Sequence, residues 1–305
     1  MSKTKITAED ITKNLDLTDK TIVITGVSSG IGYETMRVLA MRGAHIIAVG
    51  RSLEKVKNAG SNEKITPLYC DLTDLNSVKQ CAEQIIALKI PIDVLICNAG
   101  IMALHKLTVK DGLELQFFTN YMAHFLLTYL LMDAICAAKK GRIVMVTGEA
   151  FRSTVKGGID FNNLDGSKGY SPWRFYGQSK LANLLAAVSF NERFKAFGVT
   201  ANSVHPGIIS TNLMRNMGGI LGWLLRSSLA TWLIGRLYQT VEEGAAAQCF
   251  VAVHPDTAEI GGAYFLGTQL ARPSYYGRSK ELADQLWDFS LAYLQPYLTN
   301  TPIKT

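Results

Sequence analysis

The stretch TIVITGVSSGIGYETMRVLA at residues 21–40 decides the fold. Its first five residues are all β-branched and predict a buried strand at 21–25. The glycines that follow indicate a tight turn, and a helix is predicted over Ile31–Arg42, ending before Gly43. A strand, a glycine turn and a helix in this order form a unit whose helix N-terminus can bind an anion.

The same alternation of strand and helix continues along the chain. Strand-like apolar runs lie at 44–49, 65–69, 93–98, 142–147 and 199–205, with a short strand near Gly262–Phe265. Helices are predicted over Asp74–Leu88, Asp111–Lys139, Tyr176–Ala196, Val241–Val253 and Lys280–Tyr297. This order predicts an α/β fold: a doubly wound, Rossmann-type, mostly parallel sheet with helices on both faces.

No linker, repeat or low-complexity segment divides the chain, so we expect residues 1–305 to form a single domain with its core at about 20–270. The 48% hydrophobic and 18% charged content fits a folded globular protein. The apolar segment 213–237, which contains Trp223 and Trp232, is interpreted as a substrate lid. Core packing and peripheral contact with a membrane surface are the alternatives for this segment.

Composition narrows the function classes. The net charge of +6 favours anionic partners such as phosphorylated cofactors, but no basic run supports nucleic-acid binding. The five cysteines form no C-x-x-C pair, which argues against a disulfide framework or a metal site. The polar N-terminus has no secretory signal, so we expect a cytoplasmic protein.

Four motifs carry the chemistry. Gly26, Gly30 and Gly32 are spaced G-x-x-x-G-x-G, and with Thr25 they resemble the T-G-x-x-x-G-x-G turn of the short-chain dehydrogenases/reductases. Three further motifs of that family follow in its order, namely Asn98-Ala99-Gly100, Tyr176-Gly-Gln-Ser-Lys180, and Pro206-Gly207 with Thr211. The tracts at 120–128, 159–166 and 262–265 resemble its retinol-dehydrogenase-like members.

The resemblance implies a dinucleotide site. Glycines in the turn let the backbone approach the pyrophosphate closely. Asp71, after the third strand, is implied to contact the cofactor, and an ordinary helix N-cap is the alternative role for this residue. The residues implied to bind the cofactor are Gly26, Ser28, Ser29, Gly30, Ile31, Gly32, Asp71, Leu72, Asn98, Ala99, Gly100, Tyr176, Lys180, Pro206, Gly207, Ile209 and Thr211.

The residue after the second strand predicts which dinucleotide binds. An acidic residue there would hold the ribose 2′-hydroxyl of NAD, but the chain has Gly50-Arg51-Ser52. The Arg51 guanidinium can pair with the additional phosphate of NADP, so NADP(H) is predicted in preference to NAD(H). A solvated loop position is the alternative for Arg51.

Tyr176 and Lys180 are the predicted proton-transfer pair. A tyrosine with a pKa of about 10 holds its proton too tightly to exchange it near neutral pH. Lys180 lies one helical turn further on, where its ammonium can stabilise the phenolate. Asn120 resembles the family asparagine that holds a water in a proton relay to this lysine.

One family position departs from the pattern. Gly148 occupies the place where these enzymes carry a serine that hydrogen-bonds the substrate oxygen. Thr147 is adjacent and is the candidate substitute, although its side chain can equally face the core. Loss of one such donor lowers rates by about 10²–10³.

These patterns predict an NADP(H)-dependent oxidoreductase that interconverts a carbonyl and an alcohol. The resemblance implies a lipophilic substrate of the retinoid, steroid or aldehyde class. Because the serine is missing, an NADP-binding sensor or scaffold protein with little turnover is the alternative. A homodimer formed through the helix that bears Tyr176 is a further expectation, unless its apolar residues face the chain's own sheet.

Overall fold

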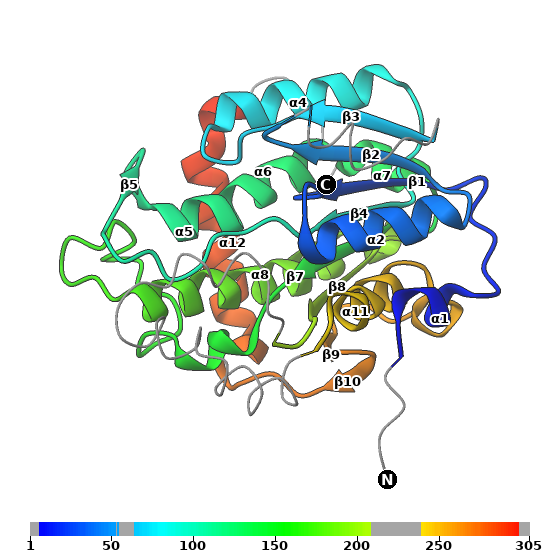
Figure 1. The fold of residues 1–305 in the computed structure, drawn as a ribbon. Coiled ribbons are helices and arrows are strands. Elements are labelled where there is room, and N and C mark those ends of the chain that lie inside the picture. Colours follow the sequence, from blue (N-terminus) through cyan, green and yellow to red (C-terminus); the bar gives the residue numbers. More distant parts are fainter. Residues whose placement is uncertain (1–5, 53, 55–63, 209–238, 299–305) are drawn as a thin grey trace, which may run out of the picture.

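A computed structural model describes residues 6–52, 54, 64–208 and 239–298. It contains an eight-stranded sheet in the order β10-β9-β8-β7-β4-β1-β2-β3 (Figure 1). All neighbouring strands are parallel except the β9–β10 pair. The strands are β1 (Thr21–Thr25), β2 (His45–Gly50), β3 (Ile65–Tyr69), β4 (Val94–Cys97), β7 (Arg142–Val146), β8 (Thr200–His205), β9 (Tyr264–Leu266) and β10 (Gln269–Ala271).

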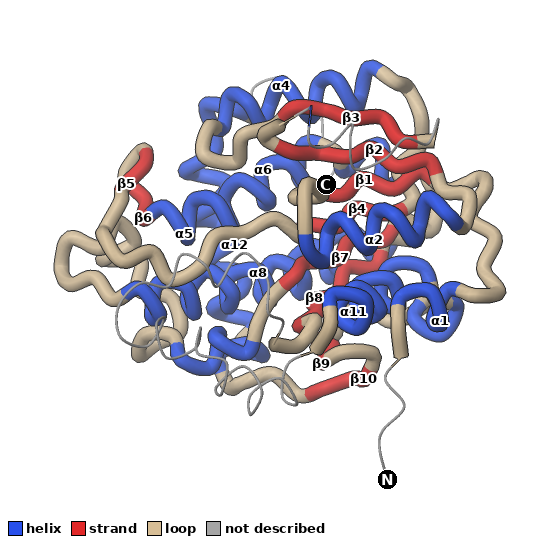
Figure 2. Tube along the Cα trace, viewed as in Figure 1, coloured by secondary structure: helices blue, strands red, loops and turns tan. Residues whose placement is uncertain are grey.

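Helices cover both faces of the sheet (Figure 2). On β1, Val23 packs into one apolar core, whereas Ile22 and Ile24 pack into the other, as the alternation of a strand requires. The first core includes α4 (Leu75–Ala87), α6 (Ala123–Leu130), α7 (Met132–Ala137), α8 (Pro172–Phe194) and α12 (Lys280–Leu294). The second includes α1 (Ala8–Thr12), α2 (Gly30–Met41) and α11 (Val241–Val253). The predicted doubly wound α/β fold is confirmed.

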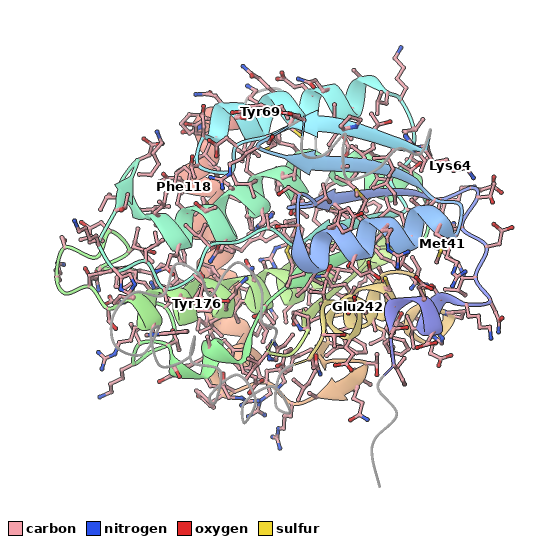
Figure 3. The ribbon with its side chains drawn as sticks, in the orientation of Figure 1. Met41, Lys64, Tyr69, Phe118, Tyr176 and Glu242 are labelled. Atoms are coloured by element: carbon pink, nitrogen blue, oxygen red, sulfur yellow. The ribbon has the colours of Figure 1, made fainter. Side chains whose placement is uncertain are left out.

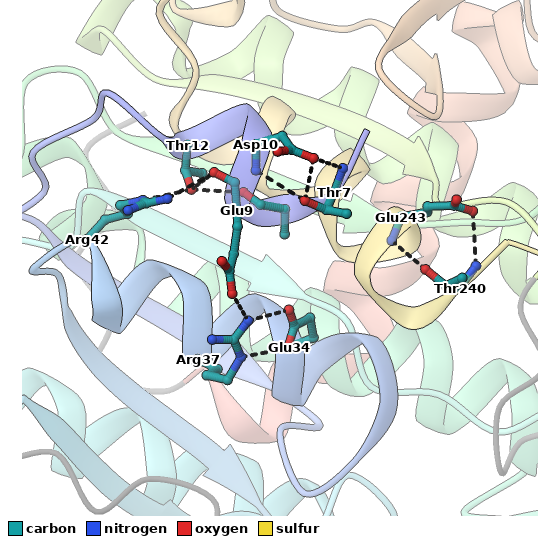
Figure 4. A network of polar contacts seen from close by, with 10 residues as sticks. Thr7, Glu9, Asp10, Thr12, Glu34, Arg37, Arg42, Thr240 and Glu243 are labelled. Carbon is teal, nitrogen blue, oxygen red and sulfur yellow. Dashed lines mark hydrogen bonds and ion pairs between the residues drawn. The ribbon is translucent and has the colours of Figure 1, made fainter. Parts of the chain in front are cut away.

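Helix α1, which the sequence did not predict, is held by polar contacts with α2 (Figure 4). Arg37 pairs with both Glu9 and Glu34, and the Arg42 guanidinium donates to the Glu9 carbonyl oxygen. The Arg37–Glu9 pair, which joins the two helices, is exposed, and such pairs contribute at most about 1 kcal/mol each. The buried side chain of Ala8 adds an apolar contact with the second core.

The helix predicted over Asp111–Lys139 is wrong at its N-terminal end. Asp111 and Gly112 have φ angles of 48° and 82° and form the turn between β5 (Val109–Lys110) and β6 (Leu113–Glu114). The dipeptide Asp-Gly favours this hairpin turn. The long apolar tract that follows led to the prediction of a continuous helix that included it. The helical segments that follow are α5 (Leu115–Phe117), a π-helix (Phe118–Met122), α6 and α7.

Helix α8 begins four residues before the predicted start at Tyr176. Ser171 precedes it, and Pro172 occupies the first helical position, where a missing N–H costs no hydrogen bond. Leu181, Leu184 and Leu185 lie in the chain's own first core, whereas Val188 is partly exposed. The expected homodimer stays a prediction.

Two predictions concern residues that the structure does not describe. The substrate lid at 213–237 and the cofactor residues Ile209 and Thr211 lie outside the described part of the chain. None of the described helices is long and apolar enough to cross a bilayer.

The turn between α8 and β8 provides a test of the packing. Gly198 has φ of 79°, and a Cβ there would lie 2.0 Å from the Lys139 carbonyl oxygen. Gly157 has φ of 92°, but a Cβ there meets nothing within 4 Å. We expect Gly157→Ala to lower the free energy of unfolding by about 1 kcal/mol, from strain alone, and Gly198→Ala by at least about 3 kcal/mol. Urea denaturation measures both, and equal losses would contradict the described packing.

Candidate active site

The site lies at the switch point of the strand order, where the chain stops adding strands on one side of β1 and starts adding them on the other. β1 is central, and the chain builds β2 and β3 on one side of it and β4, β7 and β8 on the other. Connections diverge at the carboxyl ends of β1 and β4, which is where such folds bind ligands. Figure 3 shows Tyr176 at the carboxyl edge of the sheet, whereas Lys64, which precedes β3, lies at the opposite edge.

The glycine turn after β1 fits a dinucleotide pyrophosphate. Gly26 and Gly30 have φ angles of 76° and 64°, in the left-handed region that favours glycine. A Cβ at Gly26 would lie 2.8 Å from the Ala99 Cα, and one at Gly32 would lie 2.3 Å from the Asn98 Nδ2. Because Ser29 makes no side-chain cap bond, the first turn of α2 retains backbone N–H groups that can bind phosphate oxygens.

Asn98 ties this turn to the end of β4. Its Nδ2 donates to the carbonyl oxygens of Thr25 at 2.8 Å and Gly26 at 3.2 Å. Its Oδ1 accepts from Gln248 Nε2 at 2.8 Å, and Gln248 Oε1 accepts from the Thr35 hydroxyl at 3.0 Å. Asn98 therefore fixes the position of the turn and, through Gln248, links it by hydrogen bonds to α2 and α11.

The Thr25 hydroxyl extends the network to a residue that the sequence did not reveal. It accepts from the backbone N–H groups of Asn98 and Ala99 at 3.0 and 3.1 Å, so its own proton points to His124 Nε2 at 2.9 Å. His124 Nδ1 then donates to the Asn120 carbonyl oxygen at 2.9 Å. Burial lowers the pKa of His124 to about 4, so the imidazole is neutral, as this arrangement requires.

Asn120 lies in the π-helix, fully buried. Its Oδ1 accepts from the Ile101 N–H at 2.8 Å, and its Nδ2 donates to the Ile101 carbonyl at 2.9 Å and to the Ser179 hydroxyl at 3.0 Å. The side chain therefore links the segment after β4 to α8. Its predicted role in holding a relay water stays a prediction.

Tyr176 and Lys180 lie together on α8. The Lys180 Nζ is 5.7 Å from the centroid of the Tyr176 ring and donates to the Val146 carbonyl at 3.1 Å. The Lys180 Nζ also lies 3.6 Å from the point where a Cβ at Gly100 would stand. Gly100 is the last residue of the Asn98-Ala99-Gly100 motif that follows β4. Burial lowers the pKa of Lys180 to about 8 and raises the pKa of Tyr176, so the phenol carries its proton in the protein alone.

The predicted role of Thr147 as substitute donor does not match its contacts. Its buried hydroxyl donates to the Lys180 carbonyl oxygen at 2.7 Å, so its proton is committed to the backbone of α8. Gly148 lies beside the Tyr176 hydroxyl, because a Cβ there would be 3.7 Å from the Tyr176 Oη. Thr147 thus positions α8 against β7.

Two further predicted cofactor residues can be located. Arg51 is exposed directly after β2. The N-cap alternative for Asp71 is wrong, because Asp74 caps α4 and the Asp71 carboxylate accepts from the N–H and hydroxyl of Thr73. The cofactor roles of Arg51, Asp71 and Leu72 stay predictions.

This geometry agrees with the comparisons with known proteins. Residues 20–219 match the family described as short chain dehydrogenase, and the chain belongs to this family of oxidoreductases. The resemblance seen in the sequence is therefore confirmed.

Individual relatives span almost the whole chain. It is 40% identical over 303 residues to Short-chain dehydrogenase TIC 32 A, chloroplastic, of Brassica napus, covering 95% of this chain and 93% of that protein. It is 35% identical over 276 residues to human Retinol dehydrogenase 13, covering 88% and 82%. The structure of an uncharacterized protein from Mycobacterium Paratuberculosis superposes with a TM-score of 0.75 at 30% identity, covering 96% and 98%.

The burial of Lys180 makes stability depend on pH. Its folded pKa, about 8, lies below the unfolded value near 10.5, so the charge destabilises the fold below pH 8, and this penalty disappears as the pH rises to about 10.5. The shift corresponds to at most about 3 kcal/mol. We expect Lys180→Met to raise the Tm at pH 7 by about 2–4 °C and to lose this advantage near pH 10.5.

Calorimetry of the protein without cofactor measures this difference. Lys140→Met is the matched control, because the Lys140 side chain is 83% exposed, and its Tm should follow that of the wild type at every pH. An unchanged Tm for Lys180→Met at pH 7 would show that the buried ammonium carries no penalty.

Proposed function

We propose that the protein is an NADP(H)-dependent oxidoreductase that interconverts a carbonyl and an alcohol on a lipophilic small molecule. The observation that carries this proposal is the convergence of the Tyr176–Lys180 pair and the glycine turn at the same edge of the sheet. The nicotinamide of the bound cofactor would supply or accept the hydride.

The chain's own residues handle the proton. During reduction the substrate oxygen gains negative charge, and the Tyr176 hydroxyl donates its proton to it, which leaves a phenolate. The Lys180 ammonium, one turn away, stabilises that phenolate and lowers the pKa that burial alone raises. Oxidation of an alcohol runs the same proton transfer in reverse.

The preference for NADP(H) is proposed from Arg51. Its exposed position at the end of β2 leaves the guanidinium accessible to a phosphate on the adenosine ribose. No acidic residue stands at 50–52 to hold a free 2′-hydroxyl.

The proposed lipophilic substrate class has two supports. The relative Retinol dehydrogenase 13 is named for an apolar alcohol. In this chain, the Trp173 side chain is 44% exposed, and its ring contacts the Tyr176 ring edge-on with centroids 6.2 Å apart. A partly exposed indole against the Tyr176 ring offers an apolar surface to the substrate.

Gly148 favours a second candidate, a cofactor-binding sensor or scaffold with little turnover. A protein that no longer reduces substrate has no use for the donor that serine provides. Such a protein would, however, have no need for a buried lysine against the tyrosine ring. Lys180 is only 4% exposed, and this burial counts against the sensor. Catalysis is therefore the first candidate.

Turnover tests the proposal. We expect NADPH oxidation at 340 nm with at least one member of a panel of retinal, steroid ketones and long-chain aldehydes. Tyr176→Phe removes only the hydroxyl and should lower kcat at least about 10³-fold while leaving the Kd for NADPH within about threefold. Tight NADPH binding by a wild type that reduces no panel member would favour the sensor.

Arg51 provides the test of cofactor preference. We expect Arg51→Ala to raise the Kd for NADPH about 10–100-fold, since a charge-assisted hydrogen bond contributes about 1.5–3 kcal/mol. The Kd for NADH should stay unchanged, which makes it the internal control. Isothermal titration calorimetry measures both, and an equal loss for the two cofactors would argue against a phosphate contact.

A further inference from the structure

His205 has an unexplained polar atom in the site. It is the last residue of β8, directly before Pro206, and only 8% of the residue is exposed. Its Nδ1 is buried and has no hydrogen-bond partner among the residues that the structure describes. Leaving a buried polar atom unpaired costs about 1–3 kcal/mol, so such an atom in a site points to a ligand that completes it.

The unpaired atom borders the space at Gly148. A Cβ built on Gly148 would lie 3.7 Å from the Tyr176 Oη and 3.9 Å from the His205 Nδ1. Apart from the residues adjacent in the chain, no other heavy atom of the described residues comes within 4 Å of that point. The two polar atoms therefore border the same small space, which a side chain at position 148 would otherwise enter.

Burial keeps the His205 ring neutral. Burial lowers the pKa of His205 to about 4, the nearby Lys180 acts in the same direction, and the Glu149 carboxylate opposes both. Glu149 is itself engaged by the Arg152 guanidinium and the Tyr264 hydroxyl. A neutral imidazole carries one N–H, and with the proton on Nδ1 it donates a single hydrogen bond.

The other candidate side chains do not offer this donor. The Thr147 hydroxyl donates to the Lys180 carbonyl. Asn183 has an unpaired Oδ1, but its amide nitrogen donates to the Val146 carbonyl, and an amide oxygen only accepts. The Gln178 Nε2 also has no partner among the described residues. The Oε1 of the same amide accepts from the Asp160 N–H, so the amide is directed toward the loop that contains Asp160.

We propose that His205 is a catalytic residue whose Nδ1–H donates the second hydrogen bond to the substrate oxygen, in the role that the family assigns to the serine missing at Gly148. This inference rests on the proposed function. The carbonyl oxygen accepts from Tyr176 and His205 together. As the carbon accepts hydride, the proton comes from Tyr176, and His205 keeps its own proton while stabilising the charge that develops on oxygen.

Two substitutions at His205 separate hydrogen bonding from packing. His205→Asn places an amide nitrogen close to the position of Nδ1, whereas His205→Leu fills a similar volume without a donor. We expect His205→Leu to lower kcat about 10²–10³-fold and His205→Asn to stay within about tenfold of the wild type. The Kd for NADPH should remain within about threefold in both, since both leave the glycine turn and the adjacent Pro206 and Gly207 unchanged.

A second-site change supplies an independent readout. Gly148→Ser introduces a hydroxyl into the space between Tyr176 and His205. In the His205→Leu background it should restore kcat at least about tenfold, because the serine then supplies the lost donor. The wild type and all variants are compared with NADPH and the same carbonyl panel, with Tm recorded for each to show that they fold.

The outcomes distinguish the two proposals. A His205→Leu variant with wild-type kcat, or a His205→Asn variant as impaired as His205→Leu, overturns the role of His205 while the oxidoreductase function stands. An inactive wild type that gains turnover through Gly148→Ser also overturns it, since His205 then does not replace the serine. No turnover by the wild type or by Gly148→Ser contradicts the proposed function itself.

Discussion

The close approach of the glycine turn to the end of β4 is the constraint on which the site depends. A side chain at Gly26 or Gly32 would collide with Ala99 or Asn98, so the turn closes only without one. The Asn98 amide and the Thr25 hydroxyl then satisfy the polar backbone groups that this contact buries. The chain thereby presents the N-terminus of α2 at the carboxyl edge of the sheet.

The same contacts connect the cofactor turn to the proton-transfer pair. From the Thr25 hydroxyl, hydrogen bonds run through His124 to the backbone of Asn120, and from the Asn120 amide to Ser179 on α8. Asn120 lies in the π-helix, a rare element that is frequent at functional sites, and His124 lies in the first turn of α6, which follows it. Lys180 follows Ser179 directly, so the glycine turn and the Tyr176–Lys180 pair share one buried polar framework.

The sequence predicted those parts of the molecule that local patterns determine. The alternation of strands and helices along the chain, the glycine turn and the Tyr176–Lys180 spacing are each visible in residues within a few positions of one another. The roles of His124 and His205 do not, because their partners or neighbours lie far away in the sequence, on β1 for His124 and at Gly148 and Tyr176 for His205. The direction of the Thr147 side chain was equally open, since a residue at a strand end can face either the core or the site.

Transfer of the cofactor hydrogen tests the central claim most directly. NADPH that carries deuterium at both C4 positions is incubated with the wild-type protein and a lipophilic aldehyde, and the alcohol product is analysed by mass spectrometry. We expect one deuterium on the carbinol carbon of the product formed by the wild type, and no such product with Tyr176→Phe. An alcohol without deuterium, or a labelled product formed equally by Tyr176→Phe, would contradict it.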